Sequence, residues 1–370
     1  MTGAPPVDAP PVDVVCLGES MVTFLPSRPG RLADAPSFAR TIGGAESNVA
    51  CALAAAGHRA KWVSRVGADG FGDHLVEAIG AYGVDVTAVR RDTERPTGLY
   101  FRTATDRATA GHEVAYYRAG SAASAMSPAT VPYDSVADGR VLHLSGITAA
   151  LSDDCLALTR SLTAPRAGRP LVSFDVNFRP GLWPDAPAGG RVLLDLARGA
   201  DVVFVGEDEA EEAWGVVGAE AVRAALPQPR ILVVKRGAAG AVVFAHGPKA
   251  PGQAAADLVT TVPAPRVDVV AAVGAGDAFA AGFLSGTLRG LSVPDRIRHG
   301  HLMAAATLTV PGDLGAPPAR HPAGTPGATA PRHNSWIAHA DRLVALDDES
   351  WGRLHLGPGW TGDDQEVRTP

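Results

Sequence analysis

A regular alternation of short apolar runs with segments of helical spacing limits what this chain can fold into. The runs are rich in Val, Ile and Leu and occupy residues 12–17, 61–66, 141–144, 171–175, 202–205, 231–235 and 241–245. Most are separated by segments whose apolar residues recur at helical spacing, at residues 45–58, 73–82, 153–163 and 190–198. Short strands that alternate with helices predict an α/β fold around a mostly parallel sheet. Because the runs are apolar throughout, we expect helices to cover both faces of that sheet.

Two stretches, at residues 21–42 and 97–118, break this alternation. They contain segments in which apolar and polar residues alternate, including GLYFRT and EVAYYR, with no helical pattern between them. Alternation with a period of two is typical of strands with one exposed face. We therefore predict a small antiparallel β lid that stands off the main sheet.

The chain after about Ala316 is rich in Pro, Gly, Ala and His and loses periodicity. We therefore expect a main domain over residues 12–316 and a C-terminal tail over residues 317–370 that lies outside it. Two alternatives stay open for this tail, because it still carries apolar residues: disorder, or docking on the core. The residues that would dock are Leu343, Leu346, Trp351, Leu354 and Trp360.

Composition excludes several classes of protein. The 33 Lys plus Arg are scattered and are outnumbered by 39 Asp plus Glu, which argues against a nucleic-acid binder. No basic region followed by an apolar stretch opens the chain, and no apolar run approaches ~18 residues, so we expect neither a signal peptide nor a membrane segment. Cys16, Cys51 and Cys155 are too few and too far apart for a disulfide framework or a zinc site. A cytoplasmic location fits best.

The strongest local signal is the segment VGAGDAFAAGFLSG at residues 273–286. The turn Gly274-Ala275-Gly276 precedes Asp277, which opens the predicted helix. Free backbone N–H groups at a helix N-terminus bind anions, and glycines let a phosphate come close. An aspartate there would repel a phosphate, but it suits a base that takes the proton from a hydroxyl attacking that phosphate. The other interpretation, an aspartate that only caps the helix, stays open at this point.

Two other nucleotide-binding motifs do not fit. A dinucleotide fingerprint needs Gly or Ala at its sixth position, where this chain has Phe279, and it usually lies in the first βαβ unit. A P-loop needs Gly-Lys-Ser/Thr, and none of the three lysines, Lys61, Lys235 and Lys249, follows a glycine. A nucleotide-dependent oxidoreductase is therefore disfavoured.

Weaker signals lie elsewhere in the chain. GGAESN, residues 43–48, leads into a helix, and KRGAAG, residues 235–240, follows an apolar run; each alone is an ordinary structural turn. In EVAYYR the alternation places Tyr116 and Arg118 on one face, where they either clamp an anionic, hydroxyl-rich ligand or face solvent. DVNFRP, residues 175–180, follows a strand, and α/β folds bind ligands at the carboxyl ends of strands.

In their order and spacing these segments resemble the motifs of the PfkB family, the ribokinase-like carbohydrate kinases. The resemblance covers about residues 12–316 and rests on Gly-Gly-x-x-x-Asn, Lys-x-Gly-x-x-Gly and the late Gly-Ala-Gly-Asp. It implies a ribokinase-like fold with a β lid and ATP-dependent phosphorylation of an alcohol group. It also implies ATP and Mg²⁺ as cofactors and a homo-oligomer formed through the lid. GGAESN, GLYF, YYR with SAAS, and DVNFRPGLW are similar to the 2-keto-3-deoxygluconate kinase subgroup. That similarity implies a sugar acid as the substrate.

The resemblance also implies roles for individual residues. Asp277 would be the base, and the turn 274–276 would stabilise the transferred group. The residues implied to face the sugar acid are Gly44, Asn48, Tyr100, Tyr116, Arg118, Arg179, Asp277 and Asp313. Those implied to hold ATP are Asn177, Lys235, Gly237, Gly240, Gly274, Ala275 and Gly276. This set agrees with a ligand that has a carboxylate and several hydroxyls, whereas neutral ribose would not need two arginines.

Two departures from the family pattern leave points open. Family members commonly carry an aspartate three residues before the glycine turn, where this chain has Ala271, so activation by a monovalent cation stays open. The family's Asn-x-x-Glu motif is GEDE here, at residues 206–209, which keeps Glu209 as an indirect partner of Mg²⁺ but lacks the asparagine. A sibling kinase for fructose or ribose and a non-catalytic sugar-acid sensor remain alternatives, and the gluconate or galactonate epimer is not decided.

Overall fold

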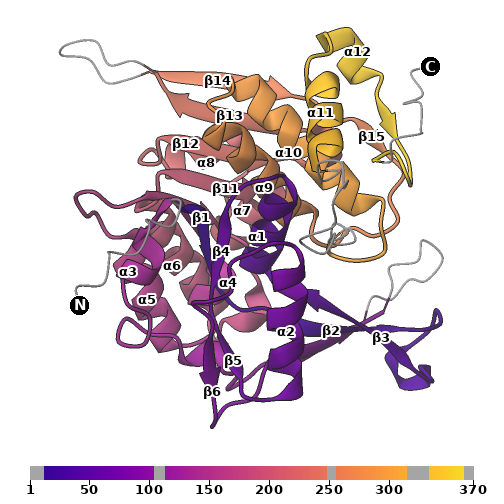
Figure 1. The fold of residues 1–370 in the computed structure, drawn as a ribbon. Helices are drawn as coiled ribbons and strands as arrows, with labels where there is room; N and C mark the ends of the chain where they lie inside the picture. The colour runs from indigo at the N-terminus through magenta and orange to yellow at the C-terminus, as the bar shows by residue number, and fades with distance from the viewer. Residues whose placement is uncertain (1–11, 104–112, 248–255, 315–332, 362–370) are drawn as a thin grey trace, which may run out of the picture.

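One mixed sheet forms the centre of the structure, a computed structural model that describes residues 12–103, 113–247, 256–314 and 333–361. The neighbouring strands from β4 to β12 pair in parallel, and β13 and β14 add antiparallel strands at one edge (Figure 1). The mostly parallel sheet predicted from the apolar runs is confirmed. The order across this sheet is β14 (Asp257–Val262), β13 (Ala241–His246), β12 (Ile231–Lys235), β11 (Val202–Gly206), β10 (Leu171–Asp175), β9 (Gly139–Ser145), β1 (Val12–Leu17) and β4 (Ala60–Val63).

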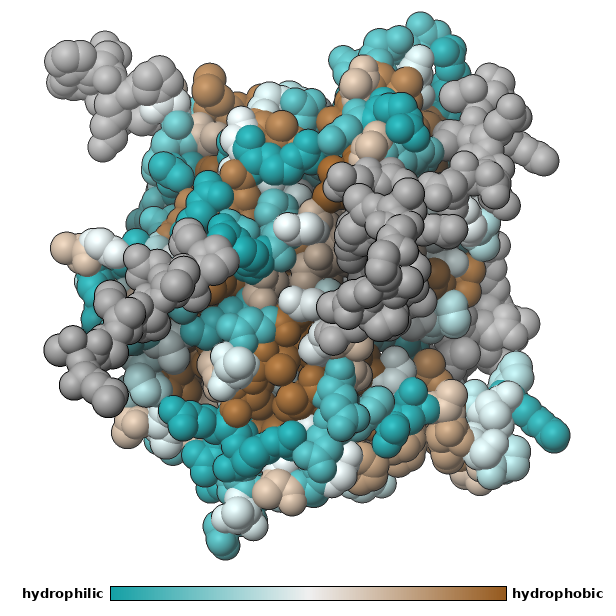
Figure 2. Space-filling view, viewed as in Figure 1, coloured by the Kyte–Doolittle hydropathy of each residue, from teal (hydrophilic) through white to brown (hydrophobic). Residues whose placement is uncertain are grey.

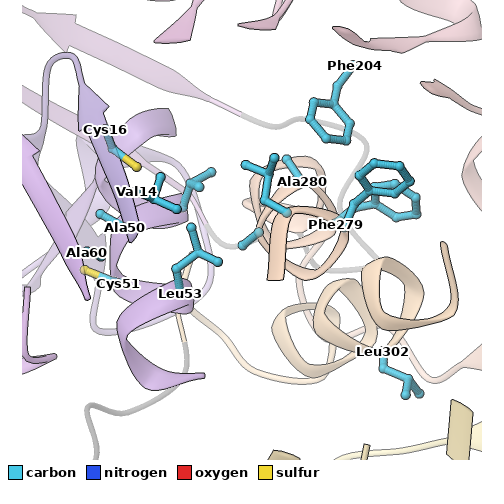
Figure 3. Packing of buried hydrophobic residues seen from close by; sticks show 14 of the residues in the cluster. Val14, Cys16, Ala50, Cys51, Leu53, Ala60, Phe204, Phe279, Ala280 and Leu302 are labelled. Atoms are coloured by element: carbon cyan, nitrogen blue, oxygen red, sulfur yellow. The ribbon is translucent and has the colours of Figure 1, made fainter. Parts of the chain in front are cut away.

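Helices cover both faces of this sheet, as the continuous apolar strands require. Alternate residues of β1 divide between two cores: Val14 and Cys16 enter one, and Val15 and Leu17 enter the other. Figure 3 shows part of the first core, to which β1, α1, α9 and α10 contribute. The first core is covered by α1 (Ala45–Ala55), α2 (Gly70–Ala81), α9 (Ala275–Leu288), α10 (Val293–Leu308) and α11 (His333–Val344). The second is covered by α3 (Asp134–Ala137), α4 (Gly146–Ala149), α5 (Asp153–Thr163), α6 (Ala186–Arg198), α7 (Glu207–Trp214) and α8 (Ala219–Ala225).

The prediction of a single strand at residues 61–66 is wrong. β4 ends at Val63, and the chain then leaves the main sheet as β5 (Arg65–Gly67), which pairs in parallel with β6 (Arg90–Asp92). The Arg65 guanidinium donates to the buried Asp92 carboxylate at 2.7 Å. This ion pair joins β5 to β6, away from the main sheet.

The lid is a separate four-stranded sheet with the order β3-β2-β7-β8 (Figure 1). Its strands are β2 (Met21–Pro26), β3 (Phe38–Gly43), β7 (Leu99–Arg102) and β8 (Val114–Tyr117). β2–β3 and β7–β8 are antiparallel, but β2–β7 is parallel, so the lid is not purely antiparallel as predicted. The predicted alternation holds in β8, where the ring of Tyr116 lies by Tyr100 and that of Tyr117 by Phe101.

The C-terminal segment packs on the core, which corrects the expectation that it lies outside the main domain. After α11 come α12 (Asp348–Gly352) and β16 (His355–Leu356), which pairs with β15 (Arg266–Val267). Of the two alternatives left open by the sequence, docking describes residues 333–361. Of the five named residues, four are buried: Leu343, Trp351, Leu354 and Trp360. The fifth, Leu346, is partly buried and packs against the same core.

The surface is largely hydrophilic around β5, β6 and α2, and hydrophobic residues gather nearer the middle of the same face (Figure 2). Short 3₁₀ helices complete the described elements: η1 (Leu32–Asp34), η2 (Ala123–Ala125), η3 (Pro180–Leu182) and η4 (Gly237–Ala239). Among the described residues, no helix is both long and apolar enough to cross a membrane.

Candidate active site

A cavity of about 660 Å³ opens between the lid, the N-termini of α1 and α9, and the carboxyl ends of β10 and β12. It collects most of the residues predicted from the sequence, although they come from distant parts of the chain. Gly237 and Gly240 are not among the lining residues. The predicted residues that line it are Gly44, Asn48, Tyr100, Tyr116, Arg118, Asn177, Arg179, Glu209, Lys235, Gly274, Ala275, Gly276, Asp277 and Asp313.

Asp277 lies in the first turn of α9, and it is not the helix cap. The N-cap is Gly274, with φ +75°, and no side chain caps the helix, so the interpretation of Asp277 as an N-cap is wrong. A Cβ at Gly274 would come within 2.6 Å of the Asp313 carbonyl oxygen, which explains the glycine there. Oδ2 of Asp277 instead accepts a hydrogen bond from Nδ2 of Asn48 at 2.9 Å.

The surroundings of Asp277 prepare it to accept a proton near neutral pH. The pKa of Asp277 is raised to about 7, chiefly by burial and in smaller part by the neighbouring carboxylates of Asp175 and Asp313. The hydrogen bond from Asn48 and the charge of Lys235 act in the opposite direction. A carboxylate with a pKa close to the working pH is suited to general base catalysis.

Lys235 brings a positive charge to the same helix terminus. It ends β12, and its Nζ lies 2.9 and 3.1 Å from the two carboxylate oxygens of Asp175 at the end of β10. Burial lowers the pKa of Lys235, but Asp175, Glu209 and Asp277 outweigh burial, so the pKa is raised and the ammonium stays charged. Nζ lies 3.4 Å from the position that a Cβ on Gly276 would take. An ammonium beside the free N–H groups of a helix makes a site suited to a phosphate.

Asp313 ties the lid to the glycine turn, through a residue that the sequence analysis missed. Its Oδ1 accepts a hydrogen bond from Nη2 of Arg102 at 2.9 Å, and its Oδ2 accepts one from the Tyr100 hydroxyl at 3.1 Å. All three residues are buried. The alternation in GLYFRT places Arg102 on the same face as Tyr100, and this signal could have identified it. Because both Asp313 oxygens bind the lid, a direct contact of Asp313 with substrate stays a prediction.

Arg118 lines the cavity, but it already has a carboxylate partner. Its Nε donates to Oε2 of Glu19 at 2.7 Å, and its Nη2 contacts the same oxygen. The other oxygen of Glu19 accepts from the Ser121 hydroxyl at 2.5 Å. Glu19 follows β1 and is buried, and no motif in the sequence pointed to it.

Arg179 differs from the other cations of the cavity. Its Nη1 donates to the Phe178 carbonyl at 2.9 Å, and it is exposed at the cavity. Arg102, Arg118 and Lys235 each pair with a carboxylate. Of the described cations that line the cavity, Arg179 is therefore the one without a carboxylate partner.

Glu209 holds together the two loops beside Arg179. Its carboxylate accepts backbone N–H groups from Gly206, at 2.8 Å, and from Phe178. This fixes the loop of Asn177, which has φ +42°. In the described part of the chain, no cluster of three or more His, Cys, Asp or Glu could hold a metal ion. An indirect role of Glu209 toward Mg²⁺ stays a prediction.

Comparison with known proteins decides the family. The family described as pfkB family carbohydrate kinase matches residues 12–320. The chain belongs to this family. It is 36% identical over 312 residues to the 2-dehydro-3-deoxygluconokinase of Bacillus subtilis (strain 168), covering 84% of this chain and 93% of that one. It is 30% identical over 321 residues to a probable chloroplastic fructokinase of Arabidopsis thaliana, covering 83% of this chain and 80% of that one.

The PfkB kinases also share the fold described above. The crystal structure of a PfkB protein from Polaromonas sp. JS666 matches with a TM-score of 0.70 and 34% identity over 80% of this chain and 95% of that one. The fold of this chain is thus ribokinase-like, as the motifs implied. The chain itself is an ATP-dependent sugar kinase. The nucleotide-dependent oxidoreductase considered from the glycine turn is excluded by this membership.

Proposed function

We propose that this kinase transfers the γ-phosphate of ATP to the terminal hydroxyl of 2-keto-3-deoxygluconate, with Asp277 as the general base. That sugar acid is the 2-dehydro-3-deoxygluconate in the name of the Bacillus relative, with which this chain shares 36% identity. The observation that carries the choice of a sugar acid is the guanidinium of Arg179, which lies at the cavity without a carboxylate partner.

Charge balance in the cavity supports an anionic substrate. The guanidinium groups of Arg102 and Arg118 are neutralised by Asp313 and Glu19, so among the described lining residues Arg179 alone offers an unbalanced positive charge on the sugar side. A planar guanidinium binds a carboxylate through two parallel hydrogen bonds. Fructose and ribose, the substrates of sibling kinases, bring no charge that would use Arg179.

In the proposed reaction, Asn48 and Arg179 orient the sugar acid beneath Tyr116 of the lid. Asp277 takes the proton from the terminal hydroxyl as the oxygen attacks the γ-phosphorus, and the bond from that phosphorus to the bridging oxygen of ADP breaks. The backbone N–H groups of the turn 274–277 stabilise the charge on the transferred group. The proton that Asp277 has accepted leaves to solvent when the lid opens.

ATP would lie between the glycine turn and Lys235, whose ammonium attracts the phosphates. Both oxygens of Asp175 pair with Lys235, and Glu209 is occupied by backbone N–H groups, so these side chains form no cage for a free cation. Mg²⁺ fits here as an ion that arrives on the ATP phosphates and keeps most of its water. When bound, it would neutralise phosphate charge during transfer.

We also propose a homo-oligomer that forms through the lid, because Tyr116 and Tyr117 on β8 are 53% and 65% exposed. The three cysteines are free and buried, which supports a reducing compartment such as the cytoplasm. Sedimentation of the full chain would test the oligomer.

A substrate panel tests the proposed function. Purified kinase is assayed with MgATP and with 2-keto-3-deoxygluconate, its galactonate epimer, fructose or ribose, and the product is examined by ³¹P and ¹³C NMR. We expect the largest kcat/KM with a 2-keto-3-deoxy sugar acid and phosphorylation at its terminal carbon. A larger kcat/KM with fructose or ribose would refute the proposed substrate, and binding without turnover would support the sensor alternative.

A further inference from the structure

Residues 354–356 contact the segment that leads into the glycine turn 274–276. β16 pairs in parallel with β15, and the two strands form a small sheet of their own. The N–H groups of Arg266 and Asp268 donate to the carbonyls of Leu354 and Leu356 at 3.0 and 2.9 Å. Nε2 of His355 lies 2.9 Å from Oδ1 of Asp268. The segment before the turn is therefore held by residues from the C-terminus.

Trp351 of α12 fixes the start of the same segment. Its indole Nε1 donates to the Pro263 carbonyl at 2.8 Å, and Trp351 is 1% exposed. The Arg298 guanidinium of α10 lies over the indole at 4.8 Å and also donates to the Val344 carbonyl at 2.9 Å. The hydrogen bond from the indole N–H and the guanidinium over the ring thus hold α12 between α10 and residue 263.

The residues that Trp351 holds also contact the other glycine motif. A Cβ at Gly240 would lie 2.2 Å from the Val262 carbonyl oxygen and 2.8 Å from Cα of Pro263. Gly240 has φ +105°, so glycine is required there for its backbone as well. The turn 235–240 therefore packs directly on residues 262–264. The segment 262–274 connects the two motifs to which ATP binding is assigned, and the C-terminal elements hold it at both Pro263 and Asp268.

We propose that residues 333–361 form a nucleotide-site brace, a positioning element that sets the affinity for ATP and leaves the affinity for the sugar unchanged. This proposal rests on the proposed function, because it takes the turns 235–240 and 274–276 as the ATP site. The brace lies beyond residue 320, where the match to the family ends. Most of the residues proposed to bind the sugar come from other elements, α1, the lid and the loop after β10, whereas Asp277 and Asp313 lie beside the turn 274–276.

A pair of matched tryptophan variants tests the brace. Trp351→Phe keeps a buried ring but loses the hydrogen bond to Pro263. Trp214→Phe in α7 loses an indole bond of the same length, 2.8 Å, to the Gly190 carbonyl. The affinity of each full-length variant for the non-hydrolysable analogue AMP-PNP with Mg²⁺ is measured by calorimetry, together with the KM for the sugar and the Tm.

We expect Trp351→Phe to bind AMP-PNP about fivefold more weakly, because one hydrogen bond contributes about 1 kcal/mol. Its KM for the sugar should stay within about twofold of wild type, and Trp214→Phe should change neither constant. His355 is exposed, so His355→Ala should not disturb folding. This variant should also bind AMP-PNP more weakly than wild type, because it loses the contact with Asp268.

Unchanged AMP-PNP affinity in Trp351→Phe and His355→Ala would overturn the brace, as would equal losses of nucleotide and sugar affinity. Since AMP-PNP binding needs no turnover, failure of the proposed sugar-acid activity would leave this measurement intact. Failure of wild-type kinase to bind AMP-PNP would refute both proposals together.

Discussion

Replacing Asp277 by Asn should abolish most catalysis while making the fold more stable. Loss of a positioned base lowers turnover by ~10²–10⁴. The stability gain follows from the pKa of Asp277, which burial raises from its ordinary value to about 7. Because folding favours the protonated form, the ionised carboxylate destabilises the fold, by about 4 kcal/mol at most when the pKa rises from 3.8 to about 7. The residue is half-buried, so solvent screening reduces this to about 1–2 kcal/mol.

The stability difference between Asp277→Asn and wild type should depend on pH. Near pH 4 Asp277 is protonated in the fold, so Asn and Asp should be nearly equal in stability. The advantage of Asn should grow up to about pH 7 and then stay constant, since Asp277 is ionised above that pH. Melting curves at pH 4.5, 6 and 8 should show the Tm of Asp277→Asn rising above wild type by about 1–3 °C at pH 8.

Activity should follow the same ionisation. Wild-type kcat/KM should fall about tenfold per unit below pH 7, and Asp277→Asn should lack this acid limb. AMP-PNP binding should survive, as a control for the nucleotide site. Wild-type turnover in Asp277→Asn would show that Asp277 is not the base. A stability difference independent of pH would refute the assigned ionisation.

Three further substitutions or deletions test the site and the fold. Arg179→Ala should lower kcat/KM for the sugar acid by about 30-fold, because the substrate carboxylate loses hydrogen bonds from a charged group that contribute about 1.5–3 kcal/mol. Any activity on fructose should change much less, and Arg198→Ala, an exposed arginine of α6, is the control. Arg118→Ala should leave Glu19 buried without its partner and destabilise the fold by about 3–5 kcal/mol in urea titrations, so equal stability of variant and wild type would contradict the ion pair. A chain ending at residue 332 should melt well below the full chain in circular dichroism, and an unchanged melt with full activity would contradict the packing of residues 333–361 on the core.

Most of the fold could be predicted from the sequence because its short apolar runs alternate regularly with segments of helical spacing. Ligand-facing residues at strand ends and helix starts, such as Asp277 and Asn48, could be predicted because short motifs mark them. Glu19 could not be assigned, because no motif marks it and its ion pair with Arg118 joins segments that are distant in the chain. The alternation in GLYFRT could place Arg102 beside Tyr100, but it could not show that Asp313 is its partner. The docking of Trp351 was left open for the same reason: a lone tryptophan in a stretch without periodicity does not show what it packs against.

Two hydrogen bonds of the site have a consequence for synthesis of the enzyme. Arg102 and Asp313 are 211 residues apart, and Asn48 and Asp277 are 229 apart. Before residues 277 and 313 leave the ribosome, the N-terminal strands can pair with one another, but the lid has no Asp313 to bind and the base is missing. A nascent chain at that stage can therefore form strands of the sheet but has no complete active site. Phosphoryl transfer can start only after Asp277 and Asp313 have been made, and a chain that terminates before Asp277 lacks the base.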